Sequence, residues 1–471
     1  MSFTLGRPVF VLMLAAAASG IAVWRRPVAP RADLVLWSFA ETHVATLRNS
    51  PRDSHGSRAP SLLKQFQMRT GLTTNVSLVG QTGENIRLAS AFMSGSSGPS
   101  IPDLCEIEIN SVGEFLRPPV DDIGLLPLDD FLRKSGWEDR IIASRFAPWS
   151  KIDARTGARI IYGIPEDVHP VTIAYRKDLF DDAGIDLRQA GTWSGFWDLC
   201  LEFQNYWAKH GRPDRRAIAL STNSSDEIVE MLLQRHINLI DSSDRLHFTD
   251  PKVLETLVFY AQLIAGPRAI AADPSPGVEW TEDFDRGNVC AVCTPDWKAD
   301  YLREFTPDLA GKVAMMPLPR FEPGDAPTST LGGTMIGICR SCPHPDQAWE
   351  LLEFLFLSPQ SHRAAVAAGD DVLPAVPEYW SDPAYHLPDG FFAGGQSIGD
   401  LYVSLAPRIP ERLMTPYTYQ AELALGVVLH RAMEYLAAGG NVDGLRGPCA
   451  VWLAEAQDDI RRRIDFGNIE P

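Results

Sequence analysis

The sequence predicts a large α/β protein with doubly wound sheets, divided into two lobes. Short apolar runs that suit buried strands alternate with segments whose apolar residues recur every three or four positions, as on one face of a helix. The chain has 471 residues, which is enough for two or three ordinary domains with cores of their own. Repeated strand–helix units favour a parallel sheet that is covered by helices.

The first elements follow this alternation. A helix over residues 61–69 is expected to end at Gly71, since glycine readily adopts the left-handed conformation of a helix end. Ile86, Ala89 and Met93 have the spacing of one helix face, and this predicts a helix with these three side chains inward. The strands predicted around these helices cover residues 34–37, 75–79 and 103–109.

The same pattern resumes later in the chain. Thr192 is expected to cap a helix whose inner face carries Phe196, Leu199, Cys200 and Phe203. A second helix is expected to begin at Asp250-Pro251. Further strands are predicted at residues 160–164, 172–175, 289–294, 313–316 and 334–338, and further helices at 345–357, 419–438 and 450–463.

The charge balance limits the partners of the protein. The chain carries 43 Lys and Arg against 60 Asp and Glu, a net charge of −17. A surface this acidic repels nucleic acid and anionic membranes, so neither is an expected partner. The apolar share of 45% is ordinary for a globular protein and argues against global disorder.

The N-terminus has the pattern of an export signal. Residues 8–24 are uncharged and rich in small residues, with Arg7 before them and Arg25 and Arg26 after them. We therefore expect residues 1–32 to form a signal or anchor with its linker, although a buried N-terminal helix would also fit. The expected location is periplasmic or otherwise extracytoplasmic, with membrane contact only through this segment if it is retained.

Seven cysteines include two Cys-x-x-Cys pairs, Cys290/Cys293 and Cys339/Cys342. The first pair falls in a predicted strand, where residues three apart point to opposite faces, so a four-sulfur zinc site is not expected. A disulfide between Cys339 and Cys342 suits an oxidising compartment better than zinc does, without being the expected state. No metal and no cofactor is predicted.

Several motifs resemble a known family. Residues 162–180, YGIPEDVHPVTIAYRKDLF, are followed by Thr192-Trp193, and Pro295-Asp296-Trp297 and Leu331-Gly332-Gly333 come later in the same order as in that family. Over residues 33–440 the chain resembles the extracellular solute-binding proteins of the carbohydrate class, to which maltose-binding protein belongs.

The resemblance implies two α/β lobes joined by crossing strands, the type II architecture of periplasmic binding proteins. The first lobe would comprise residues 33–171 and 328–375, and the second residues 172–327 and 376–471. A small ligand would bind in the cleft, the lobes would close by a hinge motion, and an ABC permease would receive the ligand. The implied protein is a receptor rather than an enzyme.

A sugar pocket needs flat aromatic rings and a rim of carboxylates, amides and histidines. The aromatic candidates are Trp37, Trp297 and Tyr417, whereas Trp193 and Trp197 are expected to pack in a core. Glu106 and Glu108 are candidates because two acids on one face of an apolar strand need a partner, a cleft or water. The other polar and backbone candidates are Glu41, Gln81 and Thr82 in the loop after the second strand, Asp167, His169, Gly332 and Gly333.

Structural roles compete with several of these assignments. Trp37 would also fit a core, Glu41 a solvated helix face, and Asp167 and His169 a hinge held by hydrogen bonds. A polar insertion at residues 49–60 departs from the family and puts its known sugar specificities in doubt.

The residues leave other functions open. A glycoside hydrolase could use Glu106 and Glu108 as paired acids, although the chain lacks the GxSxG, HExxH and P-loop motifs of other enzymes. The same fold could bind a polyamine, an oligopeptide or a metal chelate. An anchored receptor could also serve a signalling partner instead of a permease.

Overall fold

A computed structural model of the chain describes residues 31–50, 59–94, 101–369 and 372–467. The predicted signal, up to residue 30, and most of the polar insertion, residues 51–58, lie outside the described residues. Within the described ranges, no helix is both long enough and apolar enough to cross a membrane.

The first sheet has five strands in the order β2-β1-β3-β12-β6. β1 pairs in parallel with β2 and β3, whereas β12 runs antiparallel to both β3 and β6. The strands are β1 (Leu34–Ser38), β2 (Thr74–Leu78), β3 (Leu104–Glu108), β6 (Ile164–Pro165) and β12 (Thr334–Ile338).

The strand predicted at residues 160–164 is in fact two strands. β5 (Arg159–Ile161) pairs with β4 (Ser150–Ile152) in a separate hairpin, and β6 joins the main sheet. Gly163 lies between them, where a Cβ atom would come within 2.0 Å of the Met335 sulfur. The chain therefore passes against β12 at a point where only glycine fits.

Helices cover this sheet: α2 (Glu41–Arg48), α3 (Leu62–Thr70), α4 (Gln81–Met93), α5 (Ile109–Phe115), α6 (Asp129–Ser135), α13 (Pro345–Leu352) with a π-helical turn at Glu353–Leu357, and α14 (Pro359–Ala368). The predicted cap of α3 is confirmed, since Gly71 adopts the left-handed conformation with φ of 78°. The predicted inner face of α4 is wrong, because Ile86 and Met93 are 65% and 90% exposed. Leu88 is the buried apolar residue of α4, and Phe92 packs edge-on against Phe115.

The described chain forms two bodies. The first is built on the five-stranded sheet, and the second on an antiparallel sheet in the order β10-β7-β11. The predicted α/β class is confirmed, but only part of each lobe's strand pairing is parallel. The strands of this second sheet are β7 (Thr172–Arg176), β10 (Ala291–Thr294) and β11 (Val313–Pro317). The second body also has a small parallel pair of β8 (Ile218–Ala219) and β9 (Ala271–Ala272).

Helices pack around this second sheet and bury a large aromatic core. Thr192 caps α8 as predicted by accepting a hydrogen bond from the Gly195 N–H at 3.1 Å, and Phe203 on that helix stacks on Phe180. Trp193 is fully buried in this core and Trp197 is half-buried against it, as expected. The helices are α7 (Lys177–Asp182), α8 (Trp193–Lys209), α9 (Asp226–Gln234), α10 (Pro251–Ile264), α11 (Trp280–Asp285), α12 (Asp296–Phe305), α15 (Ile398–Leu405), α16 (Thr418–Ala437) and α17 (Arg446–Gly467).

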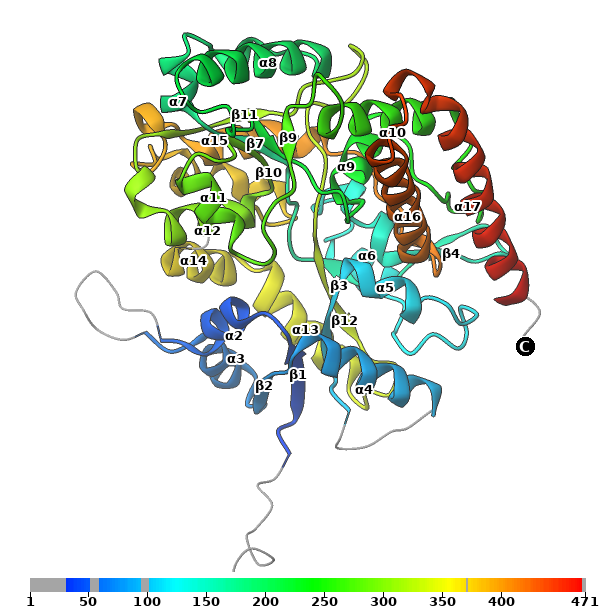
Figure 1. Ribbon diagram of the computed structural model, residues 1–471. Helices are drawn as coiled ribbons and strands as arrows, with labels where there is room; N and C mark the ends of the chain where they lie inside the picture. The colour runs from blue at the N-terminus through cyan, green and yellow to red at the C-terminus, as the bar shows by residue number, and fades with distance from the viewer. Residues whose placement is uncertain (1–30, 51–58, 95–100, 370–371, 468–471) are drawn as a thin grey trace, which may run out of the picture.

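Two bodies are visible in Figure 1, with β1, β2 and α2–α4 in the lower one and β7, β10, β11 and α8 in the upper one. The chain crosses between them three times, after β6, before β12 and between α14 and α15, and the first two crossing segments lie side by side. Pro170 bridges to Thr330, and the Val171 N–H donates to the Ser329 carbonyl at 3.1 Å. The two sheets lie on either side of this crossing; the residue limits proposed for the lobes stay a prediction.

All seven cysteines are buried thiols. Cys339 packs in the core beside Cys105, with the two sulfur atoms 3.9 Å apart, whereas Cys342 belongs to a different core cluster. Cys339 and Cys342 are therefore free thiols in the structure, not the local disulfide that the sequence left open.

A candidate ligand-binding cleft

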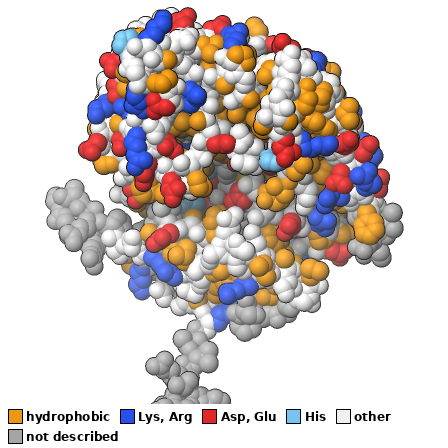
Figure 2. Space-filling view, in the orientation of Figure 1, with side chains coloured by type: hydrophobic (Ala, Val, Ile, Leu, Met, Phe, Trp, Pro, Cys, Tyr) orange, Lys and Arg blue, Asp and Glu red, His pale blue; other side chains and the backbone are white. Residues whose placement is uncertain are grey.

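A cleft of about 750 Å³ lies between the two bodies, and Figure 2 shows the hollow at this boundary. The first body contributes α2, which follows the carboxyl end of β1, and α14. The second contributes α12, which follows the carboxyl end of β10. Ligands of open α/β sheets bind outside the carboxyl ends of strands, so this placement fits a binding site. Its lining includes Thr42, His43, Thr46, Asn49, Asp167, His169, Trp297, Asp300, Tyr301, Glu304, Thr334 and Ala364.

Asp167 and His169 line the floor of the cleft and form a network, the floor network, with the buried Arg145 and Asp296 behind them. The His169 ring contacts two carboxylates, with Nε2 at 3.0 Å from Asp167 Oδ2 and Nδ1 at 2.6 Å from Asp296 Oδ1. The Arg145 guanidinium donates to the Asp167 carbonyl at 3.1 Å and to the Thr330 hydroxyl at 3.0 Å. Because Asp296 opens α12 in the second body, this network ties that body to the crossing segments.

The floor network is buried and nearly balanced in charge. Burial opposes protonation of His169, but the charges of Asp167 and Asp296 outweigh it and raise the pKa of His169 to about 10. Burial likewise opposes ionisation of Asp167, yet the His169 and Arg145 charges hold the pKa of that carboxyl below its usual range. Two cations therefore face two anions, an arrangement that makes a buried ionic network tolerable.

The backbone around this network is unusual in two places. His169 has a φ of 54°, which is rare for a residue with a side chain. Gly333 has a φ of 139°, and a Cβ atom there would lie 2.5 Å from the Arg145 guanidinium. A Cβ at Gly332 would lie 3.3 Å from the Trp297 indole nitrogen. These two glycines were predicted as positions where the backbone approaches a ligand closely. In the structure the side chains of Arg145 and Trp297 lie close to this backbone.

An aromatic pair forms the second-body wall of the cleft. Trp297 and Tyr301 lie one turn apart on α12, with ring centroids 5.8 Å apart in an edge-on arrangement. The Trp297 indole N–H donates to the Leu331 carbonyl at 3.2 Å, which fixes the ring. Trp297 was predicted because it stands where the family that the sequence resembles has a stacking Trp, whereas Tyr301 was missed. Its spacing of four residues from Trp297 on a helix was the available signal.

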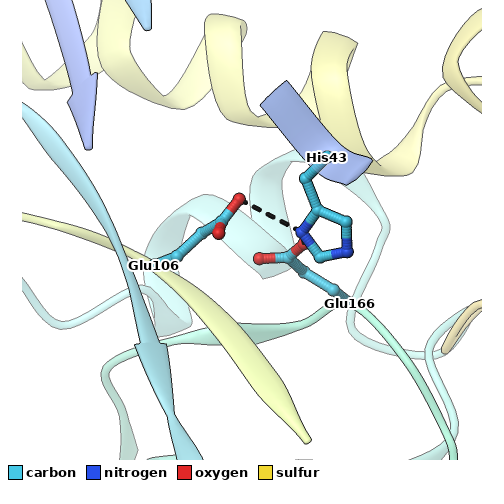
Figure 3. A group of neighbouring side chains, drawn as sticks. All are labelled: His43, Glu106 and Glu166. Carbon is cyan, nitrogen blue, oxygen red and sulfur yellow. Dashed lines mark hydrogen bonds and ion pairs between the residues drawn. The ribbon is translucent and has the colours of Figure 1, made fainter. Parts of the chain in front are cut away.

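His43, Glu106 and Glu166 of the first body point toward one another (Figure 3), and His43 of this group lines the cleft. His43 Nδ1 lies 3.3 Å from Glu106 Oε1 and 3.2 Å from Glu166 Oε2. Glu106 is fully buried, and its second oxygen accepts a hydrogen bond from Ser38 Oγ at 2.6 Å. Glu106 was predicted. His43 and Glu166 were not, because the three residues come from α2, β3 and the turn after β6, far apart in the sequence.

Glu108 points to the same strand face as Glu106 but has other partners. Its carboxylate caps α5 by accepting from the Asn110 N–H at 2.9 Å, and the Gln81 amide donates to it at 3.3 Å. Burial raises the pKa of Glu108 to about 7 against the opposing Asn110 N–H. Gln81 and Thr82 are exposed residues of the first turn of α4, so the loop predicted for them is wrong. The two acids of β3 thus have different roles: Glu108 caps α5, whereas Glu106 contacts His43.

Three further candidates lie away from the lining of the cleft. Trp37 is half-buried against the first-body core, with the Arg87 guanidinium 5.9 Å from its ring. Glu41 is an exposed residue of α2. Tyr417 is buried beside Arg117 and lines a separate cavity of about 160 Å³.

Comparisons with known proteins agree with this architecture. The sequence model of bacterial extracellular solute-binding proteins matches residues 61–391. The arabinooligosaccharide-binding protein of Halalkalibacterium halodurans is 25% identical over 397 residues, covering 82% of this chain and 81% of the relative. The lactose-binding protein of Rhizobium radiobacter is 24% identical over 327 residues, covering 69% of this chain and 72% of the relative.

Solved structures show the same fold. The sugar-binding protein MalE from Xanthomonas citri superposes with a TM-score of 0.70 at 18% identity, covering 92% of this chain and 99% of that one.

Proposed function

Because the chain belongs to the family of bacterial extracellular solute-binding proteins, we propose that it is an extracytoplasmic receptor that traps an oligosaccharide in the interlobe cleft and delivers it to an ABC permease. Relatives that align over most of their length are described as binding arabino-oligosaccharides and lactose. The expected export and the acidic surface are compatible with a freely diffusing or anchored receptor outside the cytoplasm.

One observation carries the choice of a sugar: an aromatic pair faces a polar wall across the cleft. Trp297 and Tyr301 offer apolar ring surface from α12, and the opposite side offers His43, Thr46 and Asn49. A sugar ring has C–H faces that pack on aromatic surface and a rim of hydroxyls that need donors and acceptors. The volume of about 750 Å³ lies within the range of small-molecule pockets.

The predicted residues divide into two roles in this proposal. Trp297 contacts the sugar directly, and Glu106 acts at the polar wall together with His43. Asp167, His169, Gly332 and Gly333 act through the floor network, which sets the position of α12 and hence of Trp297. Ligand binding would then favour the closed arrangement by adding contacts that exist only when both bodies face the ligand.

Calorimetric titration of the purified protein with arabino-oligosaccharides, lactose and maltose tests the proposal. We expect binding of at least one saccharide without its hydrolysis, and a loss of about 2 kcal/mol, roughly thirtyfold in Kd, in Trp297→Ala. Trp452→Ala is the matched control, since that half-buried ring lies on α17 outside the cleft lining. Equal effects of the two substitutions would contradict the proposed contact.

A cationic ligand is the second candidate, favoured by the acids at the cleft. Asp300 and Glu304 line it beside Trp297, and aromatic rings bind organic cations as well as sugars. Putrescine and spermidine therefore belong in the same titration. If a polyamine binds and no saccharide does, the proposed ligand becomes a polyamine and the proposed receptor function stands.

A further inference from the structure

The group formed by His43, Glu106 and Glu166 has the geometry of a metal site. One atom of each residue, His43 Nδ1 and one oxygen of each carboxylate, lies within 4.8 Å of the other two. The two distances from His43 Nδ1 are 3.3 and 3.2 Å. A tetrahedral ion with bonds of about 2.1 Å holds its ligand atoms about 3.4 Å apart. Rotation of one carboxyl group closes the remaining gap.

The surroundings fix these ligands in the way that metal ligands are commonly fixed. The Ser38 hydroxyl holds Glu106 Oε2 at 2.6 Å, which leaves Oε1 directed at His43. Such a hydrogen bond to the far oxygen of a carboxylate orients it for coordination. The side chains of Glu106 and Glu166 are 0% and 8% exposed, so water screens their charges poorly.

The three side chains together carry an excess of negative charge, which favours an added cation. Asp167 and Asp296 are offset by Arg145 and His169 in the floor network. Glu106 and Glu166 share one imidazole, so the group of three keeps a net negative charge even when His43 is protonated.

We propose that His43, Glu106 and Glu166 bind a divalent transition-metal ion of the Zn²⁺ class and leave one coordination position open toward the cleft. The mixed nitrogen and oxygen ligands suit Zn²⁺ better than Ca²⁺ or Mg²⁺, which prefer oxygen ligands alone. His43 is the open side, because it is 28% exposed and lines the cleft. A ligand oxygen, such as a sugar hydroxyl, then completes the coordination; this last step rests on the proposed receptor function, whereas cation binding does not.

Titration calorimetry with ZnCl₂ tests cation binding on the full chain after treatment with EDTA and desalting. We expect one site of micromolar or tighter Kd and a rise in Tm on adding Zn²⁺. His43→Ala and Glu106→Gln should weaken this binding at least a hundredfold and abolish the rise in Tm. His430→Ala is the matched control: it removes a surface imidazole that lies 3.5 Å from Glu434 on α16. It should leave the titration unchanged.

The variants separate the site from surface binding and from misfolding. Zn²⁺ binding that survives His43→Ala unchanged overturns the proposal, because such binding is elsewhere. His43→Ala alters a partly exposed residue of a short helix, so it keeps the test valid if Glu106→Gln fails to fold. Identical calorimetric traces for CaCl₂ and ZnCl₂ would also overturn the assignment to the Zn²⁺ class.

A second titration separates this inference from the proposed function. Saccharide is added in EDTA and again with saturating Zn²⁺. A Kd at least threefold lower with Zn²⁺, for the unsubstituted protein but not for His43→Ala, supports coordination of the ligand, and an unchanged Kd overturns that step. Zn²⁺ binding that depends on His43 supports the metal site even if no saccharide binds under either condition.

Discussion

His169 Nδ1 lies 2.6 Å from Asp296 Oδ1, and this contact joins the segment crossing between the bodies to the first turn of α12. The second Asp296 oxygen accepts a hydrogen bond from the Leu373 N–H at 3.3 Å, and Oδ1 also accepts from the Trp297 N–H at 2.9 Å. One carboxylate therefore contacts His169, Trp297 and Leu373. The pair of His169 and Asp296 thus links the crossing segment to α12, which carries the aromatic pair of the cleft.

Replacement of Asp296 by Asn should destabilise the protein strongly. It leaves a buried imidazolium with one carboxylate fewer, and breaking one partner of a buried ion pair costs about 3–5 kcal/mol. The free energy of unfolding from denaturant titration measures the loss. Asp308→Asn, an exposed residue, serves as the control and should change stability by less than about 0.5 kcal/mol. A similar small change in Asp296→Asn would show that the pair contributes little.

Stability should fall as the pH rises from neutral to alkaline. The pKa of His169 is raised from 6.5 to about 10 in the folded protein. The folded state therefore holds a proton that the unfolded state has released, and stabilisation present below about pH 6.5 is lost as the pH approaches 10. Denaturant titrations between pH 7 and 10 measure the slope. His169→Gln should be less stable at pH 7 and show a flatter profile; a profile as steep as that of the parent would mean that other groups cause it.

The strand pattern explains what the sequence could predict. Apolar runs identified the strands of both main sheets. Trp297 was identified by the family resemblance of Pro295-Asp296-Trp297, and the strand-end argument alone pointed to Trp37, which lies outside the cleft lining. The inner face of α4 was wrong because its apolar residues are too scattered to define one stripe. Leu88 and Phe92 pack inward, whereas Ile86 and Met93 fit the same spacing and face water.

Polar residues of the site could be predicted only where a charged residue stands in an otherwise apolar segment of the sequence. Glu106 stood out as an acid in an apolar strand, and its need for a partner was a physical inference. Its partner His43 had no such signal, since their contact depends on how α2 packs against β3. The choice between ligand contact and hinge bonding for His169 depended on Asp296, 127 residues further along the chain.

Glu230 should destabilise the folded protein at neutral and alkaline pH. It is 2% exposed, neither oxygen makes a hydrogen bond among the described residues, and burial followed by the Glu227 charge raises its pKa well above 4.5. The folded state keeps this proton after the unfolded state has lost it, so stability falls as the pH rises above about 4.5. Glu230→Gln removes the titration, and we expect a higher free energy of unfolding than the parent at pH 8. Glu202→Gln, on the exposed side of α8, should have no effect, and a destabilised Glu230→Gln would contradict the prediction.

Gly333→Ala should disturb the floor network beyond the backbone cost of the substitution. The added Cβ would lie 2.5 Å from Arg145, whereas Gly184 also has a positive φ of 73° but nothing within 4 Å of a Cβ. Gly184→Ala therefore measures the cost of an ordinary left-handed backbone, about 1–2 kcal/mol. The φ of 139° at Gly333 is less accessible to a residue with a side chain, so it adds to the loss together with the Arg145 contact. Denaturant titration should show a larger loss for Gly333→Ala, by about 1–3 kcal/mol. Equal losses would show that Arg145 moves aside without cost.

Tyr301 should contribute to ligand binding through its ring. It lies edge-on to Trp297 and lines the cleft, so Tyr301→Ala removes apolar surface from the wall that we assign to a sugar face. Aromatic contacts of this kind are worth about 0.5–1.5 kcal/mol beyond area burial, so we expect Kd to rise about fivefold to tenfold. Tyr301→Phe should keep most of the affinity if the ring carries the contact and lose it if the hydroxyl does. Calorimetry on both variants decides between them, with Tyr206→Ala on α8 as the control: its half-buried ring stacks on His210 away from the cleft lining, and its substitution should leave Kd unchanged.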